Sequence, residues 1–236
     1  MEKNQSFKAP RNVNDLTSSL SAVIFKQKVL VLIDAANLFF STSVTKIHID
    51  FKQMYNWFSK KCNLVDVMYY TAFDPDDVKQ MAFLQDLEKS GYKLIQKPIK
   101  VYSSMIKGNM DIELAVDAMN LEKQYDILAL FSGDGDFTYL IQDLEKKGKR
   151  TIVIATGGFT SYELHQQAHN YFFLNRISSI WRTPRKTSQS DGVDSQNLLP
   201  KILPPDVVLD KQTKVTPKTK LPRKNPVREV PQVFID

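Results

Sequence analysis

Acidic side chains directly follow two of the most apolar runs in the chain. The runs are Val29–Ile33 and Ile127–Phe131, and the acidic residues after them are Asp34, Asp134 and Asp136. Carboxylates that gather at one place repel one another, by roughly 4 kcal/mol for a pair about 4 Å apart at an effective dielectric of ~20. If these side chains meet in the fold, they therefore need either shared protons or a bound cation.

The kind of cation follows from the side chains that are available. Cys62 is the single cysteine, and the three histidines are scattered along the chain, so oxygen ligands dominate. Such a ligand set favours Mg²⁺ or Mn²⁺, ions that polarise phosphate groups and activate water for the hydrolysis of phosphodiesters. Ordinary structural roles remain open for each acid taken singly, since aspartate also caps helices and forms turns.

Two further acids lie on one predicted helix, Met110–Glu122. Asp111 is at its start, where the helix dipole also favours a carboxylate. Asp117 follows six residues later, about 240° around the helix, so both side chains cannot point at one ion. We expect Asp117 to support the site or to face solvent. The apolar spacing predicts that Ile112, Ala115, Val116 and Met119 face the core.

Strands and helices are predicted to alternate along the central part of the chain. The expected strands are Val29–Ile33, Leu64–Ala72, Tyr92–Ile95, Ile127–Phe131, Thr151–Ala155 and an edge strand at Tyr171–Leu174. The expected helices are Phe51–Lys60, Pro75–Lys89, Met110–Glu122, Phe137–Lys147 and one that starts at Thr160 or Ser161. This order predicts βαβ units, hence an α/β fold with a mostly parallel central sheet and helices on both faces. The strand-end acids should then converge at one edge of the sheet.

Charge and composition divide the chain into three parts. Residues 1–26 are expected to be a polar leader with weak order, residues 27–182 a folded domain, and residues 183–236 a disordered basic tail. From Arg182 onward the sequence holds 11 Lys or Arg against 6 Asp or Glu, a net charge of +5 out of +6 for the whole chain. Such a tail suits nucleic acid or an acidic protein partner. Its apolar stretches, Leu198–Leu209 and Val230–Ile235, are either docking motifs or parts of a solvated linker.

No signal peptide or membrane-spanning segment is evident, which predicts a cytoplasmic protein with no membrane partner. The sequence is silent on the oligomeric state.

Three ordered motifs give the chain a family resemblance. They are Val-Leu-Ile-Asp34-Ala-Ala-Asn37, Lys107-Gly-Asn-Met-Asp111-Ile-Glu-Leu-Ala-Val-Asp117, and Phe-Ser132-Gly-Asp134-Gly-Asp136-Phe137. Over roughly residues 28–180 the sequence resembles the NYN domain, specifically its bacterial LabA-like branch. The resemblance implies a PIN-like Rossmannoid three-layer sandwich whose acids bind Mg²⁺ or Mn²⁺ and direct water at a phosphodiester, usually in RNA. One departure is Ala168-His169-Asn170, where the family often has an Ala-Asp pair.

The resemblance also implies residue roles. Asp34, Asp111 and Asp134 would be catalytic metal ligands, and Asp136 would be either a further ligand or a residue that holds a metal-bound water. Asn37 would orient Asp34 or a bound phosphate, while the hydroxyl groups of Ser132 and Ser161 would bind phosphate.

A basic segment leads toward Asp111. The side chains of Lys97, Lys100 and Lys107 could contact a phosphate backbone, and Tyr102 could stack on a base. A solvated basic loop explains the same residues equally well.

Three functions fit these observations. The leading one is an Mg²⁺- or Mn²⁺-dependent ribonuclease. The second is a non-catalytic regulator that binds RNA or protein on the same fold, and the third is a metal-dependent phosphatase that acts on small phosphates.

Overall fold

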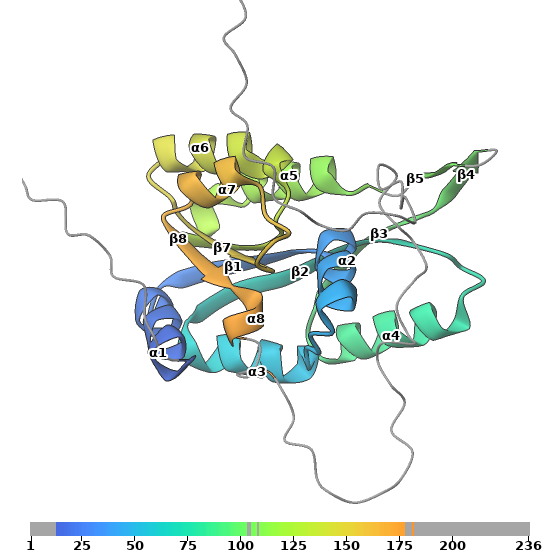
Figure 1. Cartoon of the computed structure of the whole chain (residues 1–236), viewed down its shortest axis with the longest axis horizontal. Helices are drawn as coiled ribbons and strands as arrows, with labels where there is room; N and C mark the ends of the chain where they lie inside the picture. Colours follow the sequence, from blue (N-terminus) through green and yellow to red (C-terminus); the bar gives the residue numbers. More distant parts are fainter. Residues whose placement is uncertain (1–12, 103–104, 108, 178–180, 182–236) are drawn as a thin grey trace, which may run out of the picture. The chain divides into compact units, whose positions relative to one another are not determined.

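The computed structural model of the chain describes residues 13–102, 105–107, 109–177 and 181 (Figure 1). For residues 13–17, 100–102 and 105–107 it describes the backbone alone, and the predicted tail, 183–236, lies outside the described residues. Six strands form one sheet in the order β3-β2-β1-β6-β7-β8. Every neighbouring pair is parallel. This confirms the α/β class and sharpens the expected mostly parallel sheet to a wholly parallel one.

The central strands owe their position to uniformly apolar sequences. β1 and β6 lie side by side in the middle, and each is buried on both faces, as strands covered by two helical layers must be. The six strands are β1 (Lys28–Asp34), β2 (Asn63–Phe73), β3 (Lys93–Pro98), β6 (Ile127–Phe131), β7 (Arg150–Ala155) and β8 (Asn170–Phe173). Because all six run the same way, their carboxyl ends share one edge of the sheet.

Helices cover both faces of the sheet and bury a separate apolar core on each (Figure 1). One face carries α1 (Val13–Ile24), α2 (Ala35–Thr45), α3 (Phe51–Lys61), α4 (Val78–Lys89) and α8 (Leu174–Ile177). The other carries α5 (Asp111–Asn120), α6 (Thr138–Lys146) and α7 (Tyr162–Gln167). Short 3-10 turns, η1 (Glu122–Gln124) and η2 (Gly135–Phe137), precede β6 and α6. Among the described residues no helix is long and apolar enough to cross a membrane.

In the second half of the expected leader the structure has a helix where we expected weak order, and residues 1–12 lie outside the described residues. Residues 13–24 form α1, and the side chains of Leu20 and Ile24 are fully buried in the core shared with α3 and α8. Those two residues are one helical turn apart and lie on the apolar stripe that attaches the helix, and the partly buried Val23 packs against the same core. The structure also adds α2, and an antiparallel hairpin of β4 (Lys100–Tyr102) and β5 (Met105–Lys107) in the segment expected to be a basic loop.

The predicted inward face of the Met110–Glu122 helix is wrong for Ile112 and Val116, while Ala115 and Met119 are partly buried and pack against the core as predicted. In α5 the buried residues are Leu114 and Ala118, whereas Ile112 is 77% exposed and Val116 is 49% exposed. Met110, Leu114 and Ala118 lie four residues apart, and this second apolar stripe packs on the sheet. Both stripes fit helical periodicity, so only the packing of α5 on the sheet shows which of them is more deeply buried.

Candidate metal centre

Asp34 occupies the junction between β1 and α2. Its carboxylate caps α2 by accepting the N–H of Asn37 at 3.1 Å, and its other oxygen accepts the hydroxyl of Ser132 at 2.9 Å. The side chain is nearly buried, with the residue 8% exposed. Because Ser132 directly follows β6, this contact joins the ends of the two central strands.

The start of α2 also holds the loop that follows β6. The Ser132 hydroxyl oxygen accepts the N–H of Asp134 at 3.1 Å, and the Asn37 side-chain carbonyl accepts the N–H of Gly133 at 3.0 Å. Asp34 and Asn37 thus fix the backbone that presents Asp134. Ser132 and Asn37 therefore form hydrogen bonds within the protein, and these bonds position Asp134.

Three carboxylates converge beyond this loop. Asp111, Asp134 and Asp136 each offer an oxygen, and these oxygens all lie within 4.8 Å of one another. Asp134 also accepts the N–H of Asp136 at 3.0 Å and thereby begins the η2 turn. A hard divalent cation fits this set, because its donors are carboxylate oxygens alone. We refer to these three residues as the acid trio.

Asn109 orients the remaining member of the trio. Its side-chain carbonyl accepts the N–H of Asp111 at 2.7 Å, while its amide group donates to the Asp111 carboxylate. Asn109 is not among the residues predicted for the site, although an asparagine two residues before an aspartate at a helix start is a recognisable turn pattern.

The electrostatics of the site favour a bound cation. Burial raises the pKa of Asp34 to about 6; hydrogen bonds from Asn37 and Ser132 oppose that rise, and the charges of Asp111 and Asp134 add to it. The pKa of Asp111 is also raised, first by desolvation and further by Asp134 and Asp136, against the hydrogen bond from Asn109. A bound cation would oppose both shifts, because it stabilises the charged carboxylates against desolvation and against one another.

The other predicted site residues have distinct places. Asp34 lies beside the acid trio, close enough for their charges to interact, but it is outside the set that converges within 4.8 Å. Asp117 accepts the hydroxyl of Tyr70 from β2 at 3.0 Å, which ties α5 to the sheet. Ser161 caps α7 by accepting the N–H of Leu164 at 3.1 Å. The side chain of Lys107 lies outside the described residues.

An open groove of about 880 Å³ extends from the acid trio between α5 and α6. Its lining combines acids with apolar side chains and includes Asp111, Ile112, Val116, Asp136 and Tyr139. The Lys97 ammonium beside it is bound to the Glu113 carboxylate at 2.7 Å. Pockets for small ligands commonly have volumes of about 300–1,000 Å³, so this groove is large enough for a nucleotide.

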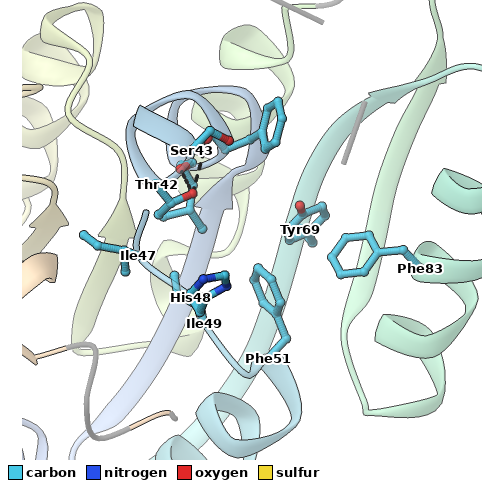
Figure 2. Close-up of a pocket in the computed structure, with 10 residues that line it drawn as sticks. Thr42, Ser43, Ile47, His48, Ile49, Phe51, Tyr69 and Phe83 are labelled. Carbon is cyan, nitrogen blue, oxygen red and sulfur yellow. Dashed lines mark hydrogen bonds between the residues drawn. The ribbon is translucent and has the colours of Figure 1, made fainter. Parts of the chain in front are cut away.

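A second hollow, on the other face of the sheet, is much smaller. It measures about 40 Å³ and lies among His48, Phe51, Tyr69 and Phe83 (Figure 2). That volume admits roughly one or two water molecules. It therefore offers no room for a nucleotide or a cofactor.

Comparison with known proteins shows which family the chain belongs to. The model of the NYN domain matches residues 28–175, which include all six strands of the sheet and the acid trio. The chain belongs to the NYN domain family.

Two relatives of this NYN protein are informative. It is 32% identical over 163 residues to the Low amplitude and bright protein LabA of Synechococcus elongatus, a match that covers 65% of this chain and 87% of LabA. The crystal structure of a protein of unknown function from Vibrio parahaemolyticus superposes with a TM-score of 0.58 and 26% sequence identity. That match covers 63% of this chain and 93% of the Vibrio chain. The NYN domain is PIN-like, a fold shared with nucleases.

Proposed function

We propose that this NYN protein is an Mg²⁺- or Mn²⁺-dependent nuclease that hydrolyses phosphodiester bonds in RNA. The observation that carries the proposal is the convergence of Asp111, Asp134 and Asp136 at the carboxyl edge of the central strands. Family membership supports a nucleic-acid substrate. The absence of nitrogen and sulfur ligands from the trio favours a hard cation.

The acid trio would hold the cation, and Asp34 is the candidate for a fourth ligand. When bound, the cation would stabilise the charge that develops on the phosphate and ease the deprotonation of water. Asp34 and Asn37 position the loop after β6 through Ser132 and Gly133. The phosphate-binding roles of Asn37, Ser132, Ser161 and Lys107 stay predictions; in the structure, the hydroxyls of the two serines already bond within the protein.

The reaction exchanges one phosphorus–oxygen bond for another. A water molecule gives up a proton to a carboxylate, and its oxygen bonds to phosphorus from the side opposite the leaving group. The bond from phosphorus to the leaving oxygen breaks, and that oxygen takes up a proton. Each product strand then has one new end, a phosphate on one strand and a hydroxyl on the other.

The test is cleavage of end-labelled single-stranded RNA by the full-length protein with Mn²⁺, before and after addition of a chelator. We expect Asp134→Asn and Asp111→Asn to lose cleavage by at least about a hundredfold, since each removes a charged ligand. Asp86→Asn is the matched control, because Asp86 is an exposed aspartate on α4 whose carboxylate forms a surface ion pair with Lys89. Equal rates in all four proteins would refute the site. RNA binding without any cleavage would favour the non-catalytic regulator.

A further inference from the structure

Exposed apolar side chains gather on the two helices beside the acid trio. Seven large apolar side chains are exposed in the described part of the chain, and three of them line the groove between α5 and α6. They are Ile112 at 77%, Val116 at 49% and Tyr139 at 72% exposure. Apolar side chains scattered singly over a surface need no explanation, whereas a group of them in one groove marks an interaction site.

The groove and the acid trio share residues. Asp111 and Asp136 belong to both, and Ile112 is the next residue after Asp111 on the first turn of α5. A phosphate held at the trio would therefore have its attached nucleoside at the mouth of the groove. From there the Tyr139 ring and the Ile112 side chain offer the flat and apolar surfaces on which bases stack.

We infer that the groove between α5 and α6 binds the base next to the phosphate at the acid trio, and that this base must be unpaired. The inference rests on the proposed function and deepens it, because it names the form of nucleic acid that the site accepts. In a duplex the base faces are stacked on one another, so only an unpaired nucleotide can place a base face against Tyr139.

The charge of the groove makes this binding depend on the cation. Asp111, Glu113, Asp136 and Asp143 line it, and its single lysine in the described structure, Lys97, is bound to Glu113. Without a cation the groove would repel a polyanion. The Lys146 ammonium lies 5.9 Å from the centre of the Tyr139 ring, so one positive charge accompanies the stacking surface itself.

The experiment measures the binding of a short fluorescent single-stranded RNA to the full-length protein by anisotropy. Ca²⁺ serves as the probe cation, because it prefers oxygen ligands as Mg²⁺ does. We expect Tyr139→Ala to weaken binding about tenfold, as the loss of one base-stacking contact does, and Tyr139→Phe to preserve it. Tyr162→Ala is the matched control, since Tyr162 on α7 is also 72% exposed but lies outside the groove.

Two further arms use the same assay. A chelator should remove most of the binding, and the duplex form of the same RNA should bind more weakly than the single strand. Equal affinities of the Tyr139→Ala and Tyr162→Ala variants would overturn the inference, and so would equal binding of duplex and single strand. In that case a protein segment is the better occupant of the groove.

Failure of the inference differs from failure of the proposed function. If the wild-type protein binds the single strand through Tyr139 and cleaves no RNA with Mn²⁺, the base-binding groove stands and the nuclease fails. If it cleaves RNA and the Tyr139→Ala variant binds and cleaves as the wild type does, the nuclease stands and the groove assignment fails.

Discussion

The residue with the largest consequence at the site is Asp34, a carboxylate almost removed from solvent. Two hydrogen bonds stabilise its charged form, from the N–H of Asn37 and the hydroxyl of Ser132, yet burial outweighs them and its pKa rises to about 6. In the absence of a cation, the protein therefore retains this charge near neutral pH at a cost in stability.

Replacing Asp34 with asparagine should stabilise the metal-free protein. The folded state holds the proton more tightly, with a pKa of about 6 against 3.8 for the ordinary group, so the stability contributed by Asp34 falls as the pH rises between these values. At neutral pH we expect the Asp34→Asn variant to gain about 1–3 kcal/mol in the free energy of unfolding. Urea unfolding with a chelator, between pH 4 and 7, measures this. If the stability of the variant depends on pH as that of the wild type does, the raised pKa of Asp34 is contradicted.

Asp117 belongs to a different class of residue, although it shares a helix and a motif with Asp111. Its carboxylate accepts the Tyr70 hydroxyl, so we predict that Asp117→Asn lowers stability by about 1 kcal/mol and preserves metal binding. Asparagine keeps a carbonyl acceptor but loses the charge, so Tyr70→Phe, which removes the donating hydroxyl altogether, is the matched comparison. Thermal unfolding without Mn²⁺ gives the stability of each variant, and the change on adding Mn²⁺ reports metal binding. Loss of the Mn²⁺ effect in Asp117→Asn alone would make Asp117 a ligand.

At the scale of elements, two loops hold each other at the carboxyl edge of the sheet. The Ser161 N–H donates to the carbonyl of Gly133 at 2.9 Å, and a side chain at Gly133 would meet the Phe159 carbonyl oxygen at 2.0 Å. The loop after β7 thus packs directly on the backbone of the loop after β6, which carries two members of the acid trio.

Gly133→Ala should therefore disturb the site through the backbone. We expect a loss of about 1–3 kcal/mol in stability, as overpacking commonly causes, and weaker binding of Mn²⁺. Gly148→Ala is the control: a side chain there meets nothing within 4 Å, so the left-handed backbone at φ 75° is the only source of strain, and it lies away from the acids. Urea unfolding and Mn²⁺ titration separate the two effects. Unchanged Mn²⁺ affinity in Gly133→Ala would show that the loops are independent.

Sequence reasoning succeeded where local pattern determines structure. The apolar runs of β1 and β6, followed by Asp34 and Asp134, predicted both the sheet and the edge at which the acids lie. It failed where tertiary packing chooses between equivalent patterns. Ile112 and Val116 are exposed because the Leu114 and Ala118 stripe docks on the sheet, and Leu20 and Ile24 are buried by contacts with distant helices.

The sequence also could not predict how close α5 lies to the loop after β6. Motif order suggested that Asp111 joins Asp134 and Asp136, and the packing of α5 brings their oxygens within 4.8 Å. The hydrogen bond from Tyr70 to Asp117 joins residues 47 positions apart, so only the folded structure shows it.

At the scale of the whole molecule, cation binding and folding should be linked. A ligand that binds only the folded state raises its stability, by about 2.7 kcal/mol at a concentration one hundred times its dissociation constant. We predict that Mn²⁺ raises the melting temperature of the wild-type protein and that a chelator reverses the rise. Asp136→Asn should reduce the effect, and Asp86→Asn should retain it. Equal rises in these two variants would place the cation elsewhere.

Chain order has a consequence for biosynthesis. Asp34 leaves the ribosome 98 residues before its partner Ser132, and the two strands that precede them are direct neighbours in the sheet. Until β6 and its loop are available, β1 lacks one of its pairing partners and the cation site lacks two of its three carboxylates. The candidate site therefore stays incomplete until the loop after β6 has been synthesised, so the proposed cleavage of RNA, including the messenger that encodes the protein, would have to wait for it. The site is complete only once the middle of the sheet has closed.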